Sequence, residues 1–171
     1  EKVISQINAL IKQYYVFMGY GEFTNYVKHK TSVADTSLSS KEQRIIETTK
    51  IRKLFNNRLI IIDEVHNIRI MQENKQTKKT ANLLMHISKH AINMRLLLLS
   101  ATPMFNSYKE IIWLTNLMNT VDKRSTIQET DVFDKAGEYL PQRTTETGEI
   151  IEGGRELLQR KLTGYISYVR G

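Results

Sequence analysis

Two carboxylates directly follow a short apolar run. Asp63 and Glu64 come after 58–62 (RLIII), and His66 completes the pattern D-E-V-H. A continuous apolar run is typical of a buried strand, and paired carboxylates at its end are costly to desolvate unless a cation or hydrogen-bond donors meet them. Asp63 is placed to hold Mg²⁺ through water, Glu64 to orient and deprotonate an attacking water, and His66 to link this loop to a neighbouring strand. A solvated turn after the strand is the alternative interpretation.

Small hydroxyl residues follow a second apolar run. Ser100 and Thr102 lie in the tetrapeptide S-A-T-P, immediately after 95–99 (RLLLL). Their hydroxyls can hydrogen-bond across to Glu64 and His66 if the two strands are neighbours. Because Ser, Thr and Pro also favour turns, a capped turn is the alternative. The pairing is more informative than either motif alone, since each motif follows an apolar strand and one predicted helix separates them.

Other sequence patterns give weaker evidence of a functional site. His86 and His90 have the i, i+4 spacing of metal ligands, but Ile87 replaces the glutamate of H-E-x-x-H, so a solvated helix face is the preferred interpretation. Ser100 lacks the G-x-S-x-G elbow of a serine hydrolase. The sequence has no Cys, which excludes a thiol nucleophile, a disulfide scaffold and a Cys-based metal centre.

Short apolar strands alternate with amphipathic helices along the chain. We expect strands at 14–18, 58–62, 95–99 and 165–169, and helices at 1–13, 22–29, 41–55, 81–94, 107–119, 130–140 and 155–162. The stretch 67–80 is predicted to be partly loop, and 147–149 to form the tip of a hairpin. This alternation predicts an α/β fold with a parallel sheet, in which function lies at the carboxyl ends of the strands.

The composition is that of a globular domain with an excess of cationic side chains. The 171 residues include 25 Lys and Arg against 18 Asp and Glu, a net charge of +7, and 40% of them are hydrophobic. This balance fits either simple solubility or a polyanionic partner such as nucleic acid. No apolar run approaches the roughly 18 residues of a membrane span, so no membrane association is expected.

With both motifs identified, the chain resembles the superfamily 2 helicases and translocases, which are nucleic-acid-dependent ATPases. D-E-V-H and S-A-T-P are similar to their motifs II and III. The longer stretches RLIIIDEVHNIR and LLLLSATPMFNSYKEI resemble a narrower group, the poxvirus and giant-virus family of nucleoside triphosphatase I and the helicase-like subunit of the early transcription factor. The segments YYVFMGYGEF, MFNSYKEIIWLTNLMN and GYISYVRG support this match. Chromatin-remodelling ATPases of the Snf class share the same motif logic.

The resemblance implies a fold and a set of site residues. The fold is a RecA-like sheet of the P-loop NTPase type, incomplete and flanked by helices, with residues 1–120 in the first RecA-like domain and 121–171 forming a helical or irregular extension and linker. ATP and Mg²⁺ are the implied cofactors. Asp63 would coordinate Mg²⁺, and Glu64 would activate water. His66 would couple the ATP site to Ser100 and Thr102. Nucleic acid would contact Gly19, Tyr20, Gly21, Lys28 and Lys30, although a solvated helix end is the alternative for the lysines.

The sequence also departs from the family pattern. It contains no G-x-x-x-x-G-K-[ST] phosphate loop and no candidate for the arginine finger of a second RecA-like domain. We therefore expect a fragment that does not hydrolyse ATP efficiently by itself and that exposes a sheet edge.

The implied function is that of a viral early-transcription ATPase. Its partners would be nucleic acid, with DNA favoured over RNA, and RNA polymerase or transcription factor subunits. Its location would be the virion or host cytoplasm, or the cytoplasm or nucleus if the protein is not viral. A non-catalytic RecA-like binding module and an Snf-type ATPase fragment are the alternatives.

Overall fold

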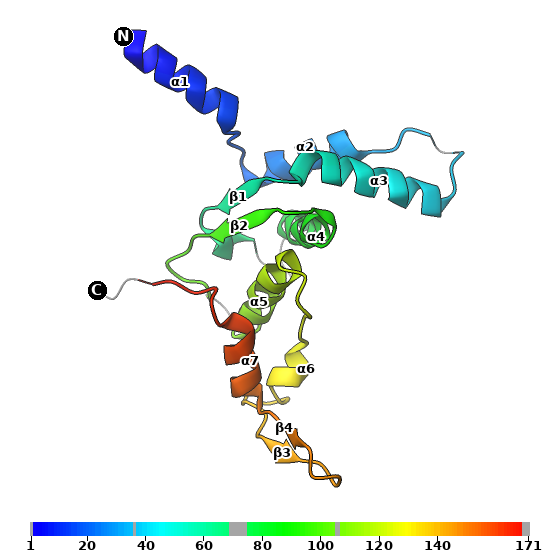
Figure 1. Cartoon of the computed structure of the whole chain (residues 1–171), viewed down its shortest axis with the longest axis vertical. Helices are drawn as coiled ribbons and strands as arrows, with labels where there is room; N and C mark the ends of the chain where they lie inside the picture. The colour runs from blue at the N-terminus through cyan, green and yellow to red at the C-terminus, as the bar shows by residue number, and fades with distance from the viewer. Residues whose placement is uncertain (1, 36, 69–74, 105–106, 169–171) are drawn as a thin grey trace.

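Two parallel strands form the centre of the computed structural model, which describes residues 2–35, 37–68, 75–104 and 107–168. Strand β1 (Leu59–Ile62) pairs with β2 (Arg95–Leu98) in a register that sets Leu59 opposite Arg95 and Ile62 opposite Leu98. Helix α4 (Lys75–His90) lies between these strands in the chain, as Figure 1 shows. The predicted strands at 58–62 and 95–99 are confirmed to be neighbours, and the fold is a mixed α/β arrangement.

Three helices pack together beside this sheet. Helices α2 (Tyr20–Thr31) and α3 (Ser40–Phe55) contact each other and α4 (Figure 1). Their shared core consists of Val27, Ile51, Phe55, Ile87, Ala91 and Met94. Burial of these apolar side chains supplies the main stabilisation of the three-helix layer. A buried hydrogen bond of 2.8 Å between Thr24 Oγ1 and Thr80 Oγ1 also joins α2 to α4.

Helix α3 begins with a capping box. The Ser39 hydroxyl accepts a hydrogen bond from the Glu42 amide, and the Glu42 carboxylate accepts one from the Ser39 amide at 2.9 Å. Two backbone groups that the first turn leaves without helical partners are thereby satisfied.

Among the described residues, one face of the sheet is covered and the other is exposed. Ile62 packs with α4 and with α5 (Lys109–Val121) in a second core cluster, which also contains Val65, Ile68, Ala81, Leu84, Leu114 and Leu117. On the opposite face, Leu59, Ile61 and Leu97 are 59%, 51% and 45% exposed. The burial that the two apolar runs predict is therefore wrong for this face of the sheet in the described residues. An apolar run reports a tendency to be buried, but the covering layer has to come from other elements.

The C-terminal part packs against α5 as a small unit. It comprises α6 (Glu129–Val132), β3 (Arg143–Thr144), β4 (Ile150–Ile151) and α7 (Gly154–Leu162), with a core of Ile112, Ile127, Val132, Phe133 and Leu158. The predicted hairpin is confirmed, because β3 and β4 pair antiparallel and Gly148 between them has a φ of +81°. The division into domains at residues 120 and 121 stays a prediction.

The helix predicted at 130–140 is wrong beyond Val132. The Asp134 carboxylate accepts hydrogen bonds from the amides of Ala136 and Glu138, both at 2.9 Å, and Gly137 adopts a φ of +88°. An Asp side chain that binds nearby backbone amides offers the chain a turn in place of a helix.

The strands predicted at the two ends of the chain are also wrong. Helix α1 (Lys2–Tyr14) includes the first residue of the predicted strand 14–18, and Tyr15, Val16 and Phe17 are exposed coil. Residues 165–168 form no strand, and 169–171 lie outside the described part. Aromatic and β-branched residues form strands where a partner strand accepts them, and the described residues provide none at either place.

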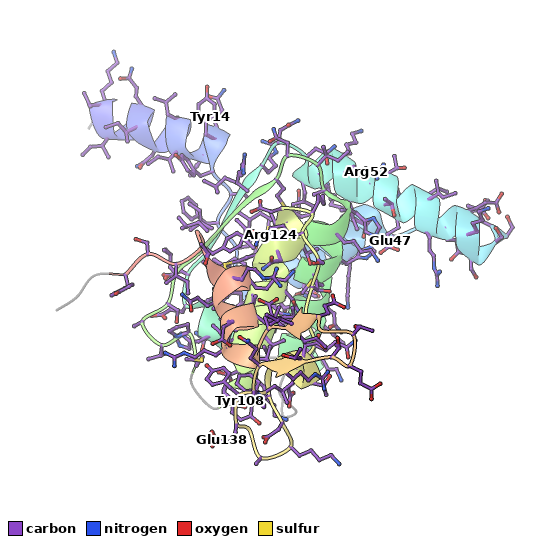
Figure 2. The ribbon with its side chains drawn as sticks, turned by 60° about the horizontal axis from the view of Figure 1, so that its bottom comes forward. Tyr14, Glu47, Arg52, Tyr108, Arg124 and Glu138 are labelled. Carbon is purple, nitrogen blue, oxygen red and sulfur yellow. The ribbon has the colours of Figure 1, made fainter. Side chains whose placement is uncertain are left out.

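Helices α1 and α4 differ from expectation in burial and in bounds. Helix α1 has the predicted apolar face, but all its side chains are exposed, and it projects from the molecule (Figures 1 and 2). Helix α4 begins at Lys75 and ends at His90 instead of spanning 81–94, whereas 69–74 lie outside the described residues.

Among the described helices, none combines the length and apolar character needed to cross a bilayer.

The shared core of α2, α3 and α4 predicts a clear contrast between two isoleucines of α3. Ile51 is fully buried and Ile45 is 57% exposed. We expect Ile51→Ala to lower the free energy of unfolding by about 2–5 kcal/mol, and Ile45→Ala to change it by less than about 0.5 kcal/mol. Urea unfolding of both variants measures this difference. Equal losses would contradict the packing of α3 described above.

The capping box predicts a pH dependence for the start of α3. Hydrogen bonds from the hydroxyl and amide of Ser39 hold the pKa of Glu42 below its ordinary value of 4.5. Because the pKa is lowered in the folded state, the stabilisation is present above the unfolded-state pKa and is lost as the pH falls through the folded-state pKa. In an NMR titration, Ser39→Ala should raise the pKa of Glu42 toward 4.5, and an unchanged pKa would argue against the box.

Candidate active site

The loops after β1 and β2 lie side by side at the carboxyl ends of the strands. Beyond the last strand pair, the Leu99 amide donates to Ile62 O at 2.9 Å and the Val65 amide donates to Leu99 O at 3.0 Å. These two bonds extend the parallel ladder into the loops. Both sequence motifs are therefore held at one edge of the sheet.

His66 connects the two loops through its side chain. Its Nδ1 is 2.9 Å from Ser100 Oγ, with which it shares a hydrogen bond, and 3.2 Å from Glu64 Oε2. Ser100 Oγ in turn accepts a hydrogen bond of 3.1 Å from the Thr102 amide. The structure thus brings Glu64, His66 and Ser100 together, and it joins Thr102 to them through its backbone amide.

The turn that presents the two carboxylates has an unusual backbone. Glu64 adopts φ 50° and ψ 49°, the left-handed conformation that non-glycine residues seldom adopt. Asp63 Oδ1 accepts a 3.0 Å hydrogen bond from the Glu64 amide, and the following residues Val65–Asn67 form a short 3₁₀ helix. Both carboxylates are exposed at this turn, so a ligand can reach them.

The carboxylate arrangement suits a metal ion that takes most of its ligands from water and substrate phosphates. Within the described ranges, no group of three or more His, Asp or Glu side chains is placed to hold a metal ion. Mg²⁺ keeps several waters and commonly binds one or two carboxylates together with substrate phosphates. The exposed Asp63 carboxylate fits that mode of binding, and a cage of protein ligands does not form here.

Tyr20 reaches the same turn from helix α2. Its hydroxyl donates to the backbone carbonyl of Asp63 and lies 3.1 Å from that of Glu64. Burial raises the pKa of Tyr20 above its ordinary value, and the carboxylates of Asp63 and Glu64 raise it further. Sequence reasoning had assigned Tyr20 to nucleic acid. It missed this contact because 43 residues separate Tyr20 from Asp63 and no sequence signal links them.

The other residues predicted to bind nucleic acid are spread along α2. Gly19 precedes the first residue of the helix, and a Cβ added there would meet nothing within 4 Å among the described residues. Gly21 lies in the first turn. Lys28 and Lys30 are exposed in the last turn, about 14 Å and about 17 Å along the axis from Gly19 at 1.5 Å per residue. The structure therefore does not bring the lysines to the glycine end of the helix.

A cavity of about 310 Å³ is lined in part by His66. Pro103 and Trp113 contribute to its wall, and Lys109 and Glu129, which form an ion pair, also line it. The Glu129 carboxylate raises the pKa of Lys109. Trp113 packs against the core and also lines this cavity.

Together, fold and site define a class: a mixed α/β protein with an exposed carboxylate pair and a His–Ser contact at the carboxyl ends of adjacent parallel strands. Function in open parallel sheets is concentrated at that edge.

Comparison with known proteins finds viral relatives. The chain is 31% identical over 178 residues to the "Putative ATP-dependent RNA helicase L377" of Acanthamoeba polyphaga mimivirus, covering 96% of this chain and 14% of that protein. It is 30% identical over 130 residues to the "Early transcription factor 70 kDa subunit" of Melanoplus sanguinipes entomopoxvirus, covering 76% of this chain and 17% of that protein. The chain is a distant homologue of both, as the sequence resemblance predicts, and spans a small part of their length. No family model and no solved structure matches it.

The left-handed turn predicts that the residue type at position 64 affects folding stability. Asn tolerates this conformation, whereas a β-branched residue does not. Glu64→Asn and Glu64→Val both remove the carboxylate, so their difference isolates the backbone effect. We expect the Val variant to be less stable than the Asn variant by about 1–2 kcal/mol in urea unfolding. Equal stabilities would show that the residue does not adopt this conformation.

Proposed function

We propose that this chain forms the water-activating and Mg²⁺-binding part of the ATP site in a nucleic-acid-dependent ATPase of superfamily 2. The observation that carries the proposal is the hydrogen bond between His66 Nδ1 and Ser100 Oγ. It joins the loops that carry the D-E-V-H and S-A-T-P motifs, beside two exposed carboxylates. The names of the two viral relatives, an ATP-dependent RNA helicase and an early transcription factor subunit, support the same class.

In this proposal the two carboxylates have different roles. Glu64 accepts a proton from the water that attacks the terminal phosphate, because an ionised carboxylate at an accessible turn can act as a general base. His66, 3.2 Å from Glu64 Oε2, orients that carboxylate. Ser100 Oγ contacts the same imidazole nitrogen, Nδ1, at 2.9 Å, and the Thr102 amide fixes the Ser100 hydroxyl. A change at the carboxylates would thereby reach the loop after β2.

Asp63 would hold Mg²⁺, with phosphate oxygens and water completing the ligand set. When bound, this ion would neutralise charge on the phosphates. Asp63 itself is oriented by the hydrogen bond from the Glu64 amide. The remaining phosphate contacts and an arginine finger would have to come from other segments or subunits, because the 171 residues contain no G-x-x-x-x-G-K-[ST] sequence.

We further propose that the sheet is part of a RecA-like domain and that nucleic acid binds at the N-terminal end of α2. Backbone amides around Gly19 and Gly21 can approach a phosphate closely, and Lys28 and Lys30 would add contacts toward the other end of the helix. DNA is the favoured nucleic acid, and RNA polymerase or transcription factor subunits are the proposed protein partners.

The general-base role of Glu64 predicts a large effect of its amide variant. Glu64→Gln keeps the size of the side chain but removes the proton acceptor, so kcat for ATP hydrolysis should fall about 100-fold or more. ATP binding should persist. Nucleic-acid-stimulated phosphate release by the full-length protein measures the effect, with Glu47→Gln on α3 as the control.

Unchanged turnover in Glu64→Gln would exclude Glu64 as the base. If the wild-type protein binds nucleic acid with a steep salt dependence but releases no phosphate, the chain is part of a non-catalytic binding module instead.

A further inference from the structure

The hydroxyl of Tyr20 joins helix α2 to the Asp63–Glu64 turn by hydrogen bonding to backbone carbonyls of the turn. We propose that Tyr20 is a positioning residue, which holds this turn in the conformation needed for hydrolysis and links it to the N-terminal end of α2. This inference rests on the proposed function, and it gives Tyr20 a role other than contacting nucleic acid directly.

The backbone of the turn explains why a hydroxyl is useful there. The Asn67 amide already donates to the carbonyl of Glu64 at 2.9 Å, whereas Tyr20 is the partner that the described structure gives to the carbonyl of Asp63. A tyrosine hydroxyl has one proton to donate, so the Asp63 carbonyl is its main acceptor and the Glu64 carbonyl a secondary one. Loss of this bond would free the peptide that precedes the left-handed residue.

Tyr20 is itself held firmly by its surroundings. Its ring packs against the cluster of Ile62, Val65 and their neighbours. Its carbonyl accepts a 3.0 Å hydrogen bond from Thr24 Oγ1, which also contacts Thr80 of α4 in the buried interior. The position of the hydroxyl therefore follows the position of α2 on the core.

This arrangement connects the proposed nucleic-acid segment to the proposed base. Tyr20 lies between Gly19 and Gly21, so a ligand that moves these backbone groups also moves the Tyr20 hydroxyl. Any shift of the turn alters the 3.2 Å contact between Glu64 Oε2 and His66 Nδ1. Small displacements of catalytic groups reduce rates strongly, so the expected effect is on kcat and not on binding.

The test compares Tyr20→Phe with Tyr26→Phe in the full-length protein. Both substitutions remove one hydroxyl from α2 and keep the ring, and the Tyr26 ring lies near Lys30 at 6.0 Å, away from the turn. We expect Tyr20→Phe to lower the nucleic-acid-stimulated kcat by about tenfold or more, with KM for ATP and the Kd for nucleic acid within about twofold of wild type. Tyr26→Phe should leave all three unchanged.

A weaker nucleic-acid Kd in Tyr20→Phe with unchanged kcat at saturation would overturn the proposal, because it would show direct contact. Unaltered kinetics would overturn it as well. Amide hydrogen exchange tests it without ATP hydrolysis: exchange within 63–67 should accelerate in Tyr20→Phe and not in Tyr26→Phe. If the wild-type protein proves inactive, the proposed function fails, whereas unchanged exchange would reject the positioning role alone.

Discussion

Parallel pairing of β1 with β2 is the constraint on which the rest of the site depends. The register that sets Leu59 opposite Arg95 also sets the two strand ends level, and the bonds from Leu99 to Ile62 and from Val65 to Leu99 continue it. His66 and Ser100 can share a hydrogen bond only because both loops leave the sheet at the same edge. Since parallel strands need a crossover, helix α4 is as necessary to the site as the strands themselves.

The helical layer contributes to the site by fixing the position of α2. Its buried contacts with α3 and α4 place Tyr20 within hydrogen-bond reach of the carboxylate turn, and the left-handed Glu64 turns the chain so that its carboxylate lies near His66. Non-glycine residues in this conformation carry an energetic cost and are most often found where structure serves function. The hydrogen bonds from Tyr20 and Asn67 hold the peptides on both sides of that residue.

The uncovered sheet face and the exposed side of α1 are both apolar surfaces in contact with water. Both are surfaces that aqueous solvent disfavours, and α/β sheets are commonly covered on both faces. Two-stranded sheets are marginal without such cover, so the packing of α4 and α5 on one face supports the strand pair in the described structure.

Local sequence by itself determined the two strands that precede the motifs, the hairpin around Gly148 and most helices, because these depend on residue type, turn chemistry and periodicity over a few positions. It also indicated Asp63, Glu64, His66 and Ser100 as candidates, since Asp63 and Ser100 directly follow apolar runs that predict strands and Glu64 and His66 lie within four residues of the first run. Only the tertiary structure decided that 14–18 and 165–168 are not strands, that one sheet face is open, and that Tyr20 contacts the carboxylate turn. Those outcomes depend on which distant segments meet, and a contact across more than 40 residues leaves no trace in local composition.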